Sequence, residues 1–220
     1  MTHEKSEKRR PVLDPVERIM EILFGLIMVL TFTSTLSAAT AGREEIRTMV
    51  FAALGCNLAW GIVDGVMYLL NTMAERGRSL RLLNAVRKTN DAAEAHRTIA
   101  DTLPPILAST ISQQELEHLR GQLQQLPEPP ARAQLHREDF VGALSVLVIV
   151  FASTFPIVIP FMIFQETVKA LRVSNAVALV LLFAGGYRLG DYAGYRPWAM
   201  GICMMGIGVI LVLLTLALGG

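Results

Sequence analysis

Five long apolar segments divide the chain, separated by short polar turns and by one long polar segment. They cover residues 22–41, 49–70, 141–164, 173–190 and 198–218. Each has about the 20 residues that an α-helix needs to cross a hydrocarbon core of roughly 30 Å. The pattern predicts an all-α membrane protein with five transmembrane helices.

The long polar segment, residues 74–139, is rich in charged residues and Gln, and prolines interrupt it at 104–105 and 127–130. Its apolar positions recur at helical spacing, which predicts a helix over 79–100 that can continue span two, a short turn at 106–109 and a helix over 112–126. Ser112 and Glu115 have the spacing of a capping box. We therefore expect four parts: a cytoplasmic N-terminal segment (1–20), transmembrane helices 1 and 2 (21–73), a cytoplasmic helical domain (74–139) and transmembrane helices 3 to 5 (140–220).

Charge sets the expected orientation of these parts. The chain has 20 Lys and Arg against 19 Asp and Glu, and most basic residues precede span one or lie between spans two and three. Basic residues concentrate on the cytoplasmic side of membrane proteins, so we expect residues 1–20 and 74–139 in the cytoplasm and the C-terminus outside. Nucleic-acid binding is not expected from a net charge of +1. With no targeting extension recognised, a bacterial plasma membrane is the expected location.

Asp64 lies in the middle of an otherwise apolar segment, residues 46–73. A charged side chain at that depth costs at least roughly 2.5 to 3.5 kcal/mol, which makes it a candidate functional residue. At 100° per residue it shares one helix face with other polar or small residues, namely Asn57, Gly61, Tyr68, Asn71 and Glu75. Such a face is expected to meet other helices or a hydrated path rather than lipid. Two structural alternatives stay open: Asp64 is neutral or hydrogen-bonded to a neighbouring helix, and Asn57 joins helices.

The first span offers a partner for this face, because Glu17, Glu21 and Met28 recur at spacings of four and seven. Carboxylate, amide and thioether groups together suit a borderline divalent ion such as Fe²⁺ or Mn²⁺. The alternative is that Glu17 and Glu21 belong to a first helical turn near the membrane surface. The predicted metal ligands are Glu21, Met28, Asn57 and Asp64, of which Glu21 and Asp64 also couple protons; the residues predicted to line the path are Glu17, Tyr68, Asn71 and Glu75.

The third span contains Pro156 and Pro160, each of which lacks a backbone donor and interrupts a helix. Broken helices at membrane depth frequently line transport sites, although a kink without transport is the alternative. In the fourth span, the glycines at 186, 190 and 194 clear one face for close helix contact.

Three local stretches resemble the vacuolar iron transporter family. They are the acid and glycine that open span one, Glu21 and Gly25; the prolines before the run 161–164; and the spaced glycines that lead to Arg196 and Pro197. The order of spans, with a cytoplasmic helical insert after span two, is similar as well. The chain differs from the family's pattern in having Met28 where an acid is usual and Asp64 where a Met is usual, so acid and thioether have exchanged helices.

That resemblance implies a homodimer whose first spans line a path exchanging cytoplasmic Fe²⁺ or Mn²⁺ for protons. No other cofactor is expected, and no enzyme is expected, since no Ser/His pair or HExxH motif lies in a span. A second function stays open from another class: a membrane sensor or scaffold without transport, which dimerises through its spans and insert. For the insert itself, the choice is between a sensing or metal-collecting domain and a solvated hairpin that stabilises the dimer.

Overall fold

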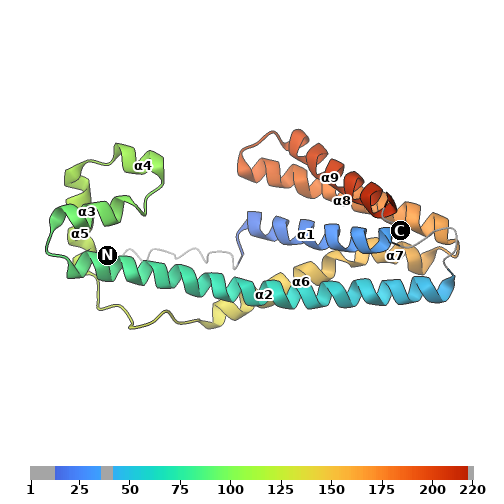
Figure 1. Ribbon diagram of the computed structural model, residues 1–220, viewed down its shortest axis with the longest axis horizontal. Coiled ribbons are helices and arrows are strands. Elements are labelled where there is room, and N and C mark those ends of the chain that lie inside the picture. The colour runs from blue at the N-terminus through green and yellow to red at the C-terminus, as the bar shows by residue number, and fades with distance from the viewer. Residues whose placement is uncertain (1–12, 36–41, 218–220) are drawn as a thin grey trace, which may run out of the picture. The chain divides into compact units, whose positions relative to one another are not determined.

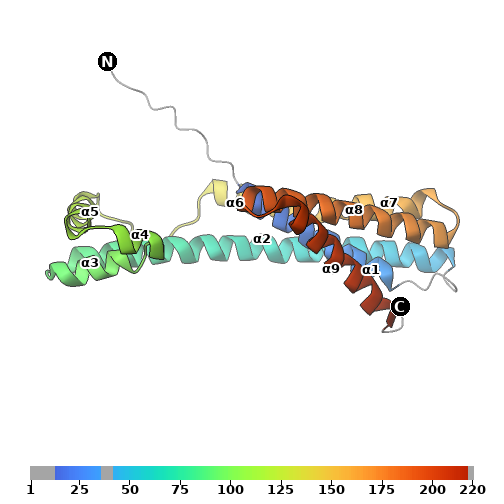
Figure 2. The same cartoon turned by 90° about the horizontal axis from the view of Figure 1, so that it is seen from above.

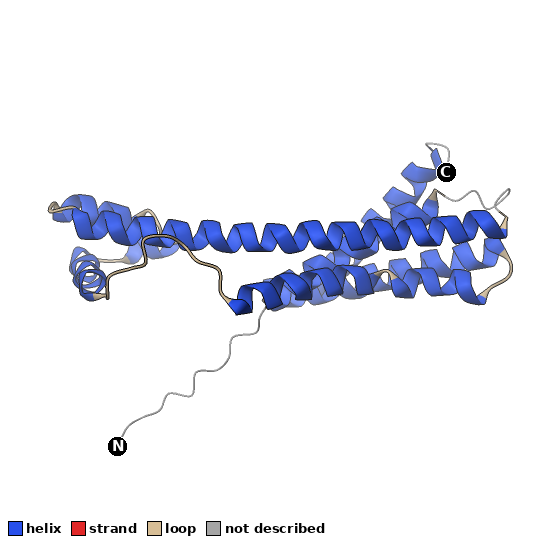
Figure 3. Ribbon diagram, turned by 90° about the horizontal axis from the view of Figure 1, so that it is seen from below, coloured by secondary structure: helices blue, strands red, loops and turns tan. Residues whose placement is uncertain are grey.

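The computed structural model describes residues 13–35 and 42–217 of the 220-residue chain. All regular structure in these ranges is helical, as the apolar pattern predicted (Figure 3). The helices, labelled in Figure 1, are α1 (Pro15–Ser34), α2 (Arg43–Lys88), α3 (Ala92–Ala100), α4 (Pro105–Thr110), α5 (Gln113–Gln125), α6 (Arg137–Ser153), α7 (Phe155–Ile163), α8 (Thr167–Ala193) and α9 (Pro197–Ala217).

The helices separate into two compact units, of which one takes residues up to Tyr68 and from Arg137, and the other takes Leu69–His136. The second unit falls within five residues of the predicted cytoplasmic domain, residues 74–139. Helix α2 contributes to both units as one unbroken helix (Figure 2).

Among the residues that the structure describes, four helical segments are long and apolar enough to cross a membrane: Glu44–Lys88, Arg137–Ile163, Thr167–Ala193 and Pro197–Ala217. The chain is therefore an all-helical protein with the character of an integral membrane protein. The first predicted span is not among the four, because α1 carries Glu17, Arg18 and Glu21 within its 20 residues. The expected end of that span, residues 36–41, lies outside the described residues.

Helix α1 lies at the centre of the membrane unit and contacts α6, α7, α8 and α9. Its apolar side chains Leu23, Leu26 and Leu30 form the core with Ile157 of α7 and Leu182 of α8. Large apolar side chains on the outside of the unit are exposed, as expected for helices that face lipid. Since lipid is as apolar as these side chains, close packing rather than the hydrophobic effect holds such helices together.

Glycines make that close packing possible at two crossings. A Cβ atom added to Gly25 of α1 would lie 2.9 Å from the Val150 carbonyl oxygen of α6, and one added to Gly65 of α2 would lie 2.9 Å from the Ala143 carbonyl oxygen. Both backbones approach too closely for any larger residue. Helix α6 is therefore held directly against α1 and α2.

The predicted break in the third span lies at Thr154, between α6 and α7. Pro156 follows in the first turn of α7 and Pro160 stands inside that helix, and neither can donate a backbone hydrogen bond. The hydroxyl of Ser174 in α8 donates to the Ile157 carbonyl oxygen over 2.7 Å, which ties α7 to the bundle beside the break.

The insert is a small helical unit whose core joins α2, α3 and α5 through Val86, Ala95, Ile99 and Leu116. The predicted helix over 79–100 is interrupted at Thr89–Asp91, because Asp91 caps α3 by accepting a hydrogen bond from the Ala93 backbone N–H. The predicted capping box of α5 is present, and hydrogen bonds from the backbone and hydroxyl of Ser112 lower the pKa of Glu115.

Candidate functional site

Asp64 lies on the part of α2 that packs against α6, and its side chain is partly buried. Its Oδ2 atom is inaccessible to solvent and has no hydrogen-bond donor among the described residues. A Cβ atom added to Gly61, one turn earlier, would lie 3.1 Å from the Leu147 carbonyl oxygen of α6. The backbones of α2 and α6 therefore approach closely one turn before Asp64.

Glu21 of α1 is the second acidic residue of this candidate site. It is half-buried and interacts electrostatically with Asp64 and with Glu17. Across the described ranges of the chain, neither Glu21 nor Asp64 forms a salt bridge with a basic residue. The membrane unit, made of the residues up to Tyr68 and from Arg137, thus contains two carboxyl groups on two helices that interact electrostatically, and no salt bridge to either is found among the described residues.

An aromatic contact marks the same crossing of α1 and α2. The rings of Phe24 and Trp60 meet edge to face, with centroids 5.9 Å apart. Phe24 comes one turn after Glu21, and Trp60 comes one turn before Asp64. This contact places an apolar pair immediately beside the two carboxylates.

Asn57 is buried and joins three helical segments. Its Nδ2 atom donates to the Gly25 carbonyl oxygen of α1 over 3.2 Å and to Oγ1 of Thr154, at the α6–α7 break, over 2.7 Å. The amide nitrogen of Asn57 therefore joins helices, which is the structural alternative that the sequence left open for this residue. A ligand role for its carbonyl oxygen stays a prediction.

The four predicted metal ligands lie at two levels of the membrane unit. Met28 is seven residues beyond Glu21 on α1, and Asn57 is seven residues before Asp64 on α2, which separates the members of each pair by about 10 Å along its helix. That all four contact one ion stays a prediction. Glu21 and Asp64 form one level, and Asn57, beside Gly25, belongs to the other.

The residues predicted to line the path differ in how far they are buried. Tyr68 is partly buried and packs over Gly142 of α6, where an added Cβ atom would lie 2.6 Å from the ring. Glu17, Asn71 and Glu75 are exposed. The polar face of α2 is thus covered as far as Tyr68.

Two polar residues at helix ends went unrecognised in the sequence. Thr154 is completely buried and accepts the Asn57 hydrogen bond, and the signal for it was its position two residues before Pro156. Asp139, the last residue of the predicted cytoplasmic domain, is buried in the first turn of α6. An acid in the first turn of a helix is favoured by the helix dipole, which was the available signal.

Within the described part of the chain, the candidate cation site does not include a cluster of His, Cys, Asp and Glu side chains. No group of three or more such residues is arranged to hold a metal ion in residues 13–35 and 42–217. In the insert, His96 contacts Glu117, while His118 contacts Gln122. The two carboxylates of the membrane unit are therefore the acidic part of the candidate cation site.

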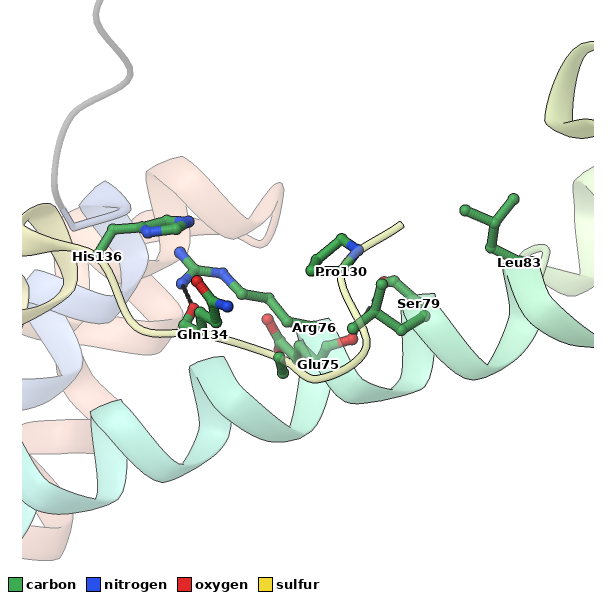
Figure 4. Close-up of a pocket in the computed structure, with 9 residues that line it drawn as sticks. Glu75, Arg76, Ser79, Leu83, Pro130, Gln134 and His136 are labelled. Carbon is green, nitrogen blue, oxygen red and sulfur yellow. Dashed lines mark hydrogen bonds between the residues drawn. The ribbon is translucent and has the colours of Figure 1, made fainter. Parts of the chain in front are cut away.

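The insert also contains a cavity of about 430 Å³ between α2 and the segment that returns to α6. Figure 4 shows the Arg76 guanidinium reaching across it to the returning segment, on the side of His136. Nη1 of Arg76 donates to the Gln134 carbonyl oxygen over 2.6 Å. Glu75, predicted to line the path, lines this cavity.

Comparison with known proteins leaves the resemblance to vacuolar iron transporters resting on the residues quoted for it: no protein-family model matches the chain, and no curated protein matches it.

Proposed function

We propose that this protein transports a divalent transition metal, Fe²⁺ or Mn²⁺, out of the cytoplasm in exchange for protons, and that Glu21 and Asp64 bind both cations in turn. The observation that carries the proposal is the Oδ2 atom of Asp64, which is inaccessible to solvent and accepts no hydrogen bond from the described residues, while Asp64 acts electrostatically on a second carboxyl group, that of Glu21. Protein carboxylates at membrane depth without a protein partner commonly bind transported ions or protons.

The coupling follows from the charge of the pair. Two carboxylates close together in a poorly hydrated site repel each other unless a cation neutralises them. A metal ion binds only when the carboxylates have released their protons, and protonation in turn displaces the metal. One pair of acids can therefore alternate between the two cargoes without any further titrating group.

Two further elements complete the proposal. Helix α1 is a fifth crossing that packs against α6, α8 and α9, and its charged residues, Glu17, Arg18 and Glu21, lie in its first two turns, near the cytoplasmic end of the crossing. A second copy of the chain supplies the remaining oxygen ligands, because Mn²⁺ and Fe²⁺ take more donors than two carboxylates provide. The N-terminus and the insert are cytoplasmic, and the membrane is a bacterial plasma membrane.

Flux into proteoliposomes tests this function. Mn²⁺ uptake driven by an imposed pH gradient should fall at least about tenfold in Asp64→Asn and Glu21→Gln, since each removes a charged ligand. Glu44→Gln is the matched control, because Glu44 is an exposed acid at the other end of the span in α2. Uptake in Asp64→Asn at the level of the control would refute the assignment.

A sensor or scaffold without transport is the second candidate, and one feature of the insert favours it. Ile106 of α4 is 79% exposed and Leu107 is 53% exposed, and α4 contributes no buried residue. An exposed apolar pair is typical of a surface that binds another protein. Wild-type proteoliposomes that move neither Fe²⁺ nor Mn²⁺ would favour this candidate.

A further inference from the structure

The cavity at Arg76 lies where the chain leaves and re-enters its apolar segments. Glu75 follows the apolar run of α2 by two residues, and His136 immediately precedes the first residue of α6. Both walls are thus joined directly to a helix that is long and apolar enough to cross a membrane. Chain continuity therefore places the cavity at the level of the phospholipid headgroups.

These two walls carry a strong excess of positive charge. The two chain segments that form these walls, residues 74–81 and 130–137, contain a single acid, Glu75, and five arginines, of which Arg76 lines the cavity and Arg78, Arg81, Arg132 and Arg137 lie beside it in the sequence. The acids that follow, Glu138 and Asp139, lie in the first turn of α6, where they complement that helix's own dipole. Clusters of basic residues next to a membrane span attract anionic lipids.

The position of Arg76 suits a phosphate group. Its bond to the Gln134 carbonyl oxygen holds the guanidinium at the cavity, with the imidazole of His136 on the same side (Figure 4). A guanidinium presents N–H donors in a planar fork that matches phosphate oxygens. Leu80, Leu83 and Pro130 give the cavity an apolar wall, which suits the glycerol part of a lipid better than a free ion.

We propose that this cavity binds the phosphate of an anionic phospholipid headgroup, with Arg76 as the principal contact and His136 beside it. The lipid joins the returning segment to α2 and stabilises the insert where it meets the membrane. This site is independent of the Glu21–Asp64 pair and of the transport function.

The test compares melting temperatures of the full chain in mixed micelles. Phosphatidylglycerol should raise the melting temperature by about 3 °C over phosphatidylcholine at equal ionic strength, and Arg76→Gln should abolish that rise. Arg87→Gln is the matched control, because Arg87 donates in the same way to the Pro127 carbonyl oxygen, over 3.2 Å, but eleven residues further along α2. The control should keep the rise.

Two further arms make the result decisive. His136→Gln changes an exposed side chain and should reduce the rise even if Arg76→Gln fails to fold. Inorganic phosphate should have no comparable effect, and an equal rise with it would replace the lipid by a free anion. The proposal fails if phosphatidylglycerol gives no rise, or if Arg76→Gln and His136→Gln both retain it.

Discussion

At the scale of single residues, Asn57 links three helical segments of the membrane unit by hydrogen bonds. Its amide hydrogen-bonds to the backbone of α1 and to Thr154 at the α6–α7 break, and both bonds are buried. Hydrogen bonds between membrane helices average about 0.6 kcal/mol and reach about 1.7. Two of them from one amide make Asn57 a structural residue whatever its role in ion binding.

Replacing Asn57 by Leu should destabilise the folded protein by about 1 to 2 kcal/mol, because two buried acceptors lose their donor. Equilibrium unfolding in a denaturing detergent measures the change, with Asn71→Leu as the control on an exposed position of the same helix. A double-mutant cycle with Thr154→Val isolates the second bond. Equal stability of Asn57→Leu and wild type would show that the bonds contribute nothing.

The sequence could predict which residues of α2 share a buried face, but not which residues of other helices they contact. Helical spacing placed Asn57, Gly61, Asp64 and Tyr68 on one face, and the structure covers that face with α6 as far as Tyr68. Thr154 could not be identified as the partner of Asn57, since that depends on how three helices pack. The exposure of Asn71 has the same origin: helical spacing says nothing of where the neighbouring helix ends.

At the scale of elements, the contact between α3 and α5 in the insert depends on a side-chain network centred on His96. Its Nε2 lies 2.7 Å from Oε2 of Glu117, and its Nδ1 lies 2.9 Å from Oε1 of Gln113. The hydrogen bond with His96, supported by the charge of Arg120, lowers the pKa of Glu117 from its ordinary value of 4.5. A carboxyl group with a lowered pKa stabilises the fold above its ordinary pKa and loses that effect as the pH falls.

We expect Glu117→Gln to reduce amide protection in α3 and α5 above about pH 4.5, and the difference from wild type to shrink as the pH falls below that value. Hydrogen exchange followed by mass spectrometry measures it, and comparing both proteins at each pH cancels the change in intrinsic exchange rate. Glu128→Gln, in the exposed proline-rich loop, is the control. A difference that stays constant down to pH 3 would contradict the role of Glu117.

The boundaries of these elements were predictable where a local signal exists. The capping box of Ser112 and Glu115 fixes the start of α5, and Pro156 accounts for the break after α6. The interruption between α2 and α3 was missed, although Thr89 and Asp91 offer side-chain oxygens that compete with helical hydrogen bonds. A continuous apolar pattern outweighed these weaker signals in the sequence.

At the scale of the whole molecule, the number of membrane crossings depends on α1. Length and composition identify four spans, because charged residues at the start of α1 lower its apolar character. The average hydropathy of α1 takes no account of its contacts with four other helices of its own unit. A helix surrounded by protein tolerates charges that a lipid-facing helix cannot.

Cysteine labelling distinguishes five crossings from four. With Cys56 and Cys203 replaced by Ser, single cysteines at Ser6, Gln125 and Lys169 are labelled from one side of sealed vesicles with a membrane-impermeant reagent. Five crossings place Ser6 and Gln125 on the same side and Lys169 on the other. Labelling of Ser6 together with Lys169 would mean that α1 does not cross.

The edge-to-face contact between Phe24 and Trp60 gives the protein a built-in optical reporter. Trp60 lies one turn from Asp64, whereas the other tryptophan, Trp198, packs against Phe183 and Tyr187 on α8. Indole emission responds to nearby charge, so the fluorescence of a Trp198→Phe protein reports on the surroundings of Asp64 alone. Cation binding to Glu21 and Asp64 can thus be followed through the emission of Trp60 while one cation at a time is added to unlabelled protein.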